Sequence, residues 1–143
     1  MANDQFDPLF RKYAAMYGVS WELLKAQVAG AENIPLDPHA VSAQGSQGLA
    51  QIMPATFQEW AHKCGIANPN PFNPDHSVHV QAAYMAHLLD VTQGDWTKAL
   101  AAYNYGLGHI ARIVKQAGDL DWMNHLPKET GDYVAKILKF LGI

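Results

Sequence analysis

The chain has 143 residues, 49% hydrophobic and 16% charged, which is enough length and apolar content for one folded domain and is not typical of a disordered chain. Its formal net charge of −3 with neutral histidines excludes a general electrostatic attraction to nucleic acid or to anionic membrane surfaces. Helix formers dominate and β-branched runs are nearly absent, so we expect an all-α fold.

Local signals predict two helices at the start of the chain. Asp7 is a suitable N-cap with Pro8 at the first helical position, and Gly18 is a typical C-terminal stop. Ser20 is the expected N-cap of a second helix over 21–32, which we expect to be central and mostly buried.

The remainder of the chain is predicted as a loop followed by further helices. Prolines, glycines and polar residues make 33–47 a loop. A short helix over 48–53 and another over 54–64 follow, and then a helix of about thirteen residues with Val78, Ala82, Met85 and Leu89 as its core stripe. Asp95 is the expected cap of a segment over 96–105, which the Gly106-Leu-Gly break ends, and a further helix runs to Gly118. Pro127 introduces a last helix, with Tyr133, Ile137, Phe140 and Leu141 on its inner side. The sum is about six to eight helices.

Glu32 ends the second predicted helix beside its apolar surface. At ~100° per residue it falls next to Val28 and Trp21 on a helical wheel. A lone glutamate on a helix is most often a solvated charge or half of an ion pair. Burial, however, disfavours the ionised form and would raise the pKa of Glu32, which suits an acid that protonates a glycosidic oxygen.

Several stretches of the chain resemble the soluble lytic transglycosylase family, glycoside hydrolase family 23, which also includes goose-type lysozymes. The stretches AEN…DPHAVSAQGSQGLAQIMPATF, ALAAYNYGLGHI and LPKETGDYVAKIL occur in the family's order. DPLFRKYAAMYGVSWELLKAQVAGAEN is similar to the usual lead-in, and PFNPDHSVHVQAAYMAHLLD to the helix between the later motifs. The resemblance implies one lysozyme-like catalytic domain over residues 1–143, with its helices around a glycan-binding groove.

The resemblance also implies roles for eight residues. Glu32 matches the catalytic glutamate, and Ser42 matches a hydroxyl held close to that carboxylate. The other substrate-binding positions are Gly48, Gln51 and Met53 in the strip that lines the groove, Tyr103 and Asn104 in the block that shapes the site, and Tyr133 in the last helix, pointing toward the glutamate. Taken singly, the Gly48 strip and the two tyrosines are more often explained by core packing.

Three positions depart from the family pattern. Asn33 stands where serine usually follows the glutamate, and the loop from Glu32 to Ala40 is one residue longer than usual. Ala50 replaces a methionine, which would widen the groove or allow a different contact with the face of a sugar. For loop conformation and substrate preference the family pattern is therefore not carried over to this chain, whereas the acid itself is retained.

Other chemistries find less support. His76 and His79 lie near Asp75, but no HExxH motif, cysteine pair or third ligand at useful spacing accompanies them, so we expect neither a metal nor a cofactor. Cys64 is the only cysteine, so no intrachain disulfide can form. Nothing in the sequence supplies a base for this thiol, and we expect it to be a small buried residue.

A glycosidase with two carboxylates needs a second acid to act as nucleophile or to activate water. The span 39–49 has none, and Asp37 is better explained by a local turn bond before Pro38. We therefore expect Glu32 to serve as the single general acid and base, with a 1,6-anhydro-muramic product. A hydrolytic goose-type lysozyme and a catalytically silent glycan-binding module remain open alternatives.

The first eight residues lack the basic and apolar regions of a signal peptide, and no window is apolar for the length of a membrane span. We expect a monomer whose partner is the peptidoglycan glycan strand, without nucleic acid or membrane insertion. It would be made in the cytoplasm and act on the cell wall, as a bacteriophage endolysin or virion-associated enzyme, or be an excised periplasmic domain of a bacterial enzyme.

Overall fold

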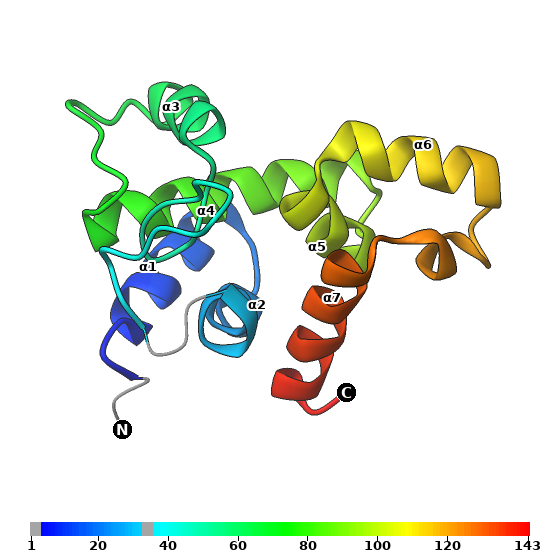
Figure 1. Cartoon of the computed structure of the whole chain (residues 1–143). Coiled ribbons are helices and arrows are strands. Elements are labelled where there is room, and N and C mark those ends of the chain that lie inside the picture. The colour runs from blue at the N-terminus through cyan, green and yellow to red at the C-terminus, as the bar shows by residue number, and fades with distance from the viewer. Residues whose placement is uncertain (1–3, 33–35) are drawn as a thin grey trace. The chain divides into compact units, whose positions relative to one another are not determined.

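A computed structural model describes residues 4–32 and 36–143, with Glu32 described by its backbone alone (Figure 1). These residues form seven α-helices, a π-helix and a short 3-10 helix, and their only β-type pairings are two isolated bridges. The expected all-α fold is therefore confirmed. The chain divides into two compact units, Met1–Ala86 and His87–Ile143.

The first unit begins with α1, Asp7–Tyr17. Its N-cap is Phe6 rather than the predicted Asp7, which lies inside the first turn. The predicted stop is confirmed, because Gly18 adopts the left-handed conformation with φ of 70°. Ser20 also caps the next helix as predicted, since its side chain accepts the backbone N–H of Leu23 at 3.2 Å.

The second helix is shorter than its sequence pattern predicts. α2 covers Trp21–Gln27 and gives way to a π-helix, η2, over Val28–Glu32, so the prediction of one continuous α-helix to Glu32 is wrong in its last part. Gln81, fully buried on α4, donates from Nε2 to the carbonyl oxygen of Leu24 at 3.0 Å. This side-chain donor therefore holds the end of α2 where the backbone pattern changes.

Two further helices complete the first unit. α3 covers Pro54–Lys63, and α4 covers Pro74–Val91 with 18 residues, longer than predicted, and extends into the second unit. Within α4 the innermost stripe ends in Leu88 rather than Leu89. The unit's largest fully buried side chains are Phe10, Leu24, Leu49, Phe57, Gln27, Gln81, Val28 and Met85.

The second unit contains α5 (Trp96–Tyr105), α6 (Leu107–Ala117), the 3-10 helix η3 (Trp122–His125) and α7 (Lys128–Leu141). Asp95 caps α5 as predicted, because its side chain accepts the backbone N–H of Lys98 at 3.2 Å. α5 packs against both α6 and α7. Ile137 is fully buried but Phe140 is 43% exposed, so the prediction that Phe140 faces inward is wrong.

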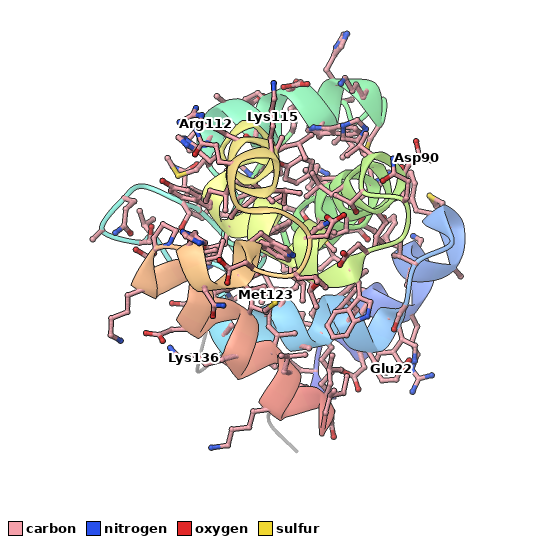
Figure 2. The ribbon with its side chains drawn as sticks, turned by 90° about the vertical axis from the view of Figure 1, so that its right-hand side faces the viewer. Glu22, Asp90, Arg112, Lys115, Met123 and Lys136 are labelled. Atoms are coloured by element: carbon pink, nitrogen blue, oxygen red, sulfur yellow. The ribbon has the colours of Figure 1, made fainter. Side chains whose placement is uncertain are left out.

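The polar side of α6 carries Arg112 and Lys115, both exposed, and Figure 2 shows them on this helix. Among the residues that the structure describes, no helix combines the length and apolar character needed to cross a membrane.

Candidate functional site

Glu32 is the last residue of η2, whose first two residues, Val28 and Ala29, are buried. Its side chain and residues 33–35, Asn33 included, lie outside the described part of the chain. The predicted position of the carboxyl at the edge of an apolar surface therefore stays a prediction. Single π-helical turns often occur at functional sites, because they change the register in which a helix presents its side chains.

The predicted helix over 48–53 is wrong. These residues form turns, with antiparallel bridges from Gln47 to Val41 and from Gln47 to Ile52. Gly48 has φ of 81° and Gln51 has φ of 52°, both in the left-handed region that an α-helix cannot contain. A Cβ atom on Gly48 would lie 1.9 Å from the carbonyl oxygen of Pro71, so glycine is required where this turn meets a neighbouring segment.

Ser42 is half-buried and bonded to Ser46 by both backbone and side chain. The Ser42 N–H donates to the Ser46 carbonyl at 2.9 Å, and the Ser46 N–H donates to the Ser42 Oγ at 3.0 Å. The two hydroxyl oxygens lie 2.7 Å apart. Sequence reasoning missed Ser46, because the Ser-Ala-Gln-Gly spacing indicates a turn but not a hydroxyl pair.

Gln51 lies in the same network, with only 8% of its surface exposed. Its Nε2 donates to the carbonyl oxygens of Ala40 at 3.0 Å and Gly48 at 2.9 Å. Its Oε1 lies 2.8 Å from the Ser46 Oγ. The structure thus brings together three of the predicted site residues, Ser42, Gly48 and Gln51, and Gln51 acts within the protein as a brace of this loop.

Ala50 and Met53 differ sharply in exposure. Ala50 is 1% exposed, and its N–H donates to the Ser77 hydroxyl of α4 at 3.0 Å. The alanine side chain itself is therefore buried, and the expectation that this smaller residue widens the groove or leaves room for a different contact with a sugar face stays a prediction. Met53 is 46% exposed at the N-cap of α3 and remains available to a ligand.

The second unit carries the other three predicted residues. Tyr103 and Asn104 are half-buried near the end of α5, and Tyr133 is 5% exposed on α7. The Thr130 hydroxyl donates to the Asn104 Oδ1 at 2.8 Å, which joins α5 to α7. Thr130 was not identified from the sequence, and its hydrogen bond to Oδ1 restrains the orientation of the Asn104 amide.

A separate polar cluster joins α1 to α4. Tyr17 Oη lies 2.7 Å from His79 Nε2, Tyr13 stacks on the His79 ring at 4.4 Å between centroids, and the Tyr13 hydroxyl donates to Asp75. Burial and the Asp75 hydrogen bond raise the pKa of Tyr13 to about 12.

Cys64, predicted to be buried, is half-buried and accepts from the Tyr17 hydroxyl at 3.5 Å. No group of three metal-binding side chains occurs among the residues described.

His79 is expected to make the stability of the protein depend on pH. Burial lowers its pKa, with Asp75 opposing and Lys12 and His76 adding to the effect. Tyr17 stays protonated, because burial raises its pKa, and its hydroxyl lies within hydrogen-bond distance of the imidazole. As the pH falls, His79 is therefore protonated in the unfolded state at a higher pH than in the folded state. The contribution of His79 to stability is fully present above the ordinary histidine pKa, and it is lost as the pH falls toward the lower pKa of the folded state. We expect the urea concentration at the unfolding midpoint to decrease as the pH is lowered from about 7.5 to about 5. In His79→Gln the same change of pH should decrease this midpoint by less. An equal decrease in the variant would contradict this assignment.

The architecture is that of the all-α, lysozyme-like class, and the comparisons with known proteins agree. The family model described as the transglycosylase SLT domain matches residues 8–126. The chain therefore belongs to the transglycosylase SLT domain family.

Three similar proteins illustrate this membership. Membrane-bound lytic murein transglycosylase F of Hahella chejuensis is 34% identical over 125 residues, which cover 82% of this chain and 23% of that protein. Peptidoglycan transglycosylase gp16 of Escherichia phage T7 is 29% identical, over 93% of this chain and 10% of its own length. The structure of the lytic transglycosylase Slt of Pseudomonas aeruginosa, an inactive glutamate-to-glutamine mutant, matches with a TM-score of 0.83 and 26% identity, over 96% of this chain and 23% of that one. This chain thus spans about a quarter or less of these relatives.

Proposed function

We propose that this chain is a lytic transglycosylase domain that cleaves the β-1,4 bond between N-acetylmuramic acid and N-acetylglucosamine in peptidoglycan. The observation that carries the proposal is the family match over residues 8–126, which includes Glu32 and reaches across both units. For this reason we also propose that residues 1–143 act as one catalytic domain. The inactivity of the Pseudomonas mutant supports a required glutamate, because that substitution removes only an acidic group.

In the proposed reaction, Glu32 donates its proton to the glycosidic oxygen while the bond from C1 to that oxygen breaks. The carbonyl oxygen of the substrate's own acetamido group stabilises the positive charge that develops at C1. The Glu32 carboxylate then accepts the proton of the C6 hydroxyl, whose oxygen bonds to C1 and closes the 1,6-anhydro ring. No water is consumed, and one residue serves as acid and then as base, which requires a pKa near the working pH.

The proposed substrate-binding residues fall into two groups. Ser42, Met53, Tyr103, Asn104 and Tyr133 would contact the glycan. Gly48 and Gln51 would act through the shape of the loop, because Pro71 leaves no room for a Cβ at Gly48 and the Gln51 amide is bonded within the protein.

Two biological settings fit this activity, a bacteriophage wall-opening enzyme and a domain of a bacterial wall-remodelling enzyme. The phage T7 relative supports the first, and the membrane-bound relative of Hahella chejuensis supports the second. In either setting the substrate is the glycan strand of the wall.

The mass of the released fragments tests the proposal. We expect purified peptidoglycan digested with this protein to yield muropeptides lighter by one water molecule than their reducing counterparts, because the ring closes without hydrolysis. Products with reducing ends alone would instead establish a goose-type hydrolase. Release of no soluble fragment, with retained binding to peptidoglycan, would establish a silent glycan-binding module.

A further inference from the structure

We infer that Ser46 is a positioning residue that fixes the direction of the Ser42 hydroxyl, so that Ser42 meets the substrate as a hydrogen-bond acceptor and not as a donor. The consequence for catalysis rests on the proposed function. The structural basis, however, is a chain of hydrogen bonds entirely within the unit Met1–Ala86.

The chain of bonds starts at the Gln51 amide, whose orientation is fixed. Its nitrogen faces two carbonyl oxygens, those of Ala40 at 3.0 Å and Gly48 at 2.9 Å. Turning the amide over would place its oxygen against both of these acceptors with no proton between them. Both Nε2 protons are therefore used, and Oε1 must face Ser46 as an acceptor.

The next step fixes the proton of Ser46. Its Oγ lies 2.8 Å from the Gln51 Oε1, a contact that needs a proton between the two oxygens. Gln51 has no proton to place there, so the single hydroxyl proton of Ser46 points to Gln51. The Ser46 oxygen is then left as an acceptor toward its other neighbour.

The last step fixes the proton of Ser42. Its Oγ lies 2.7 Å from the Ser46 Oγ, and the Ser46 proton is already committed, so the proton in this contact comes from Ser42. The Ser46 N–H also donates to the Ser42 Oγ at 3.0 Å and occupies one of its two lone pairs. One lone pair remains, on a side chain that is half-buried and therefore reachable.

A group that approaches Ser42 must then be a donor. On an N-acetylated glycan the candidates share one chemistry, that of an N–H or O–H group, with the acetamido N–H and the ring hydroxyls as its sources. An ionised carboxylate is a poor partner, because Ser42 could donate a hydrogen bond to it only by breaking its bond to Ser46. The Ser46 Oγ would then have no hydrogen-bond donor. Because the direction of the Ser42 proton is already fixed, the Ser42 hydroxyl does not have to reorient when the substrate binds.

Neutron diffraction from crystals of the deuterium-exchanged protein tests the proton directions without reference to activity. We expect the Ser42 deuterium on the line to the Ser46 oxygen, and the Ser46 deuterium on the line to the Gln51 oxygen. A Ser42 deuterium directed at any other atom would overturn the inference.

A double-mutant cycle tests the consequence for the reaction. Ser46→Ala removes the acceptor for the Ser42 proton and should lower kcat/KM on peptidoglycan by about tenfold, the value of one hydrogen bond. In a Ser42→Ala background the same substitution should change kcat/KM by less than about twofold, since there is no hydroxyl left to orient. Ser46→Thr keeps a hydroxyl and should restore most of the activity.

A purely structural role for Ser46 would lower kcat/KM equally in both backgrounds, and that result would contradict the positioning role. Thermal unfolding of each variant shows whether it is folded, and if Ser46→Ala is not, Ser46→Thr and the neutron map still decide. The proposed function fails separately, through the absence of anhydro fragments from the unmodified protein.

Discussion

Replacing Glu32 with glutamine is expected to lower the release of anhydro-muropeptides from purified peptidoglycan by about 100- to 10,000-fold, the range that a positioned acid or base contributes. Glutamine has nearly the same size and polarity but carries no acidic proton, so it can neither protonate the glycosidic oxygen nor accept the proton of the C6 hydroxyl. The initial rates of the two proteins, measured by product mass at equal concentration, give the ratio.

Glu22→Gln is the matched control, because it makes the same change in an exposed residue at the start of α2 (Figure 2). We expect it to retain the rate of the unmodified protein. If Glu32→Gln cleaved as fast as Glu22→Gln, Glu32 would not be the acid, and the proposed mechanism would be wrong even though the family assignment stands.

Local signals in the sequence predicted much of the helical framework. Gly18, Ser20 and Asp95 act as the predicted stop and caps, because a cap depends on the residue itself and on its near neighbours. Phe140 shows the limit of the same reasoning. Helical periodicity places it near Ile137, but only the packing of α7 determines how far the buried face extends.

The turn over 48–53 could not be predicted, because distant contacts define it. The left-handed conformations of Gly48 and Gln51 accompany the close approach of Pro71, which is distant in sequence, and a hydrogen bond to the carbonyl of Ala40 in the preceding loop. Small residues in a row are compatible with a helix until such contacts are known. The π-helical register at Val28–Glu32 is similarly absent from a wheel drawn at a fixed angle.

The candidate site was predictable only in part. The apolar neighbours of Glu32 indicated a candidate acid, but the roles of Ser42, Gln51 and Tyr133 were predicted only from the family resemblance. The resemblance placed Gln51 in a substrate-binding strip, whereas its amide is bonded within the loop. A motif identifies which residues matter, and hydrogen-bond accounting is needed to separate contact with the substrate from support of the loop.

The substitution Gly48→Ala is expected to destabilise the first unit by roughly 3 to 5 kcal/mol. The added Cβ would lie 1.9 Å from the Pro71 carbonyl oxygen, and a backbone atom cannot move aside as the end of a flexible side chain can. The positive φ adds its own cost for any residue with a Cβ. Urea unfolding with an unchanged m-value measures the loss. Activity should fall as well, because the Gly48 carbonyl is one of the two acceptors that hold Gln51.

Gly45→Ala separates the two causes of this loss. Gly45 has φ of 97°, in the same left-handed region, but no atom lies within 4 Å of the position that its Cβ would take. The control should therefore lose only the conformational cost, about 1 to 2 kcal/mol, and keep the Gln51 brace. Equal losses in the two variants would mean that the contact with Pro71 relaxes at little cost. The turn would then be specified by backbone conformation alone, and not by the close approach of the two segments.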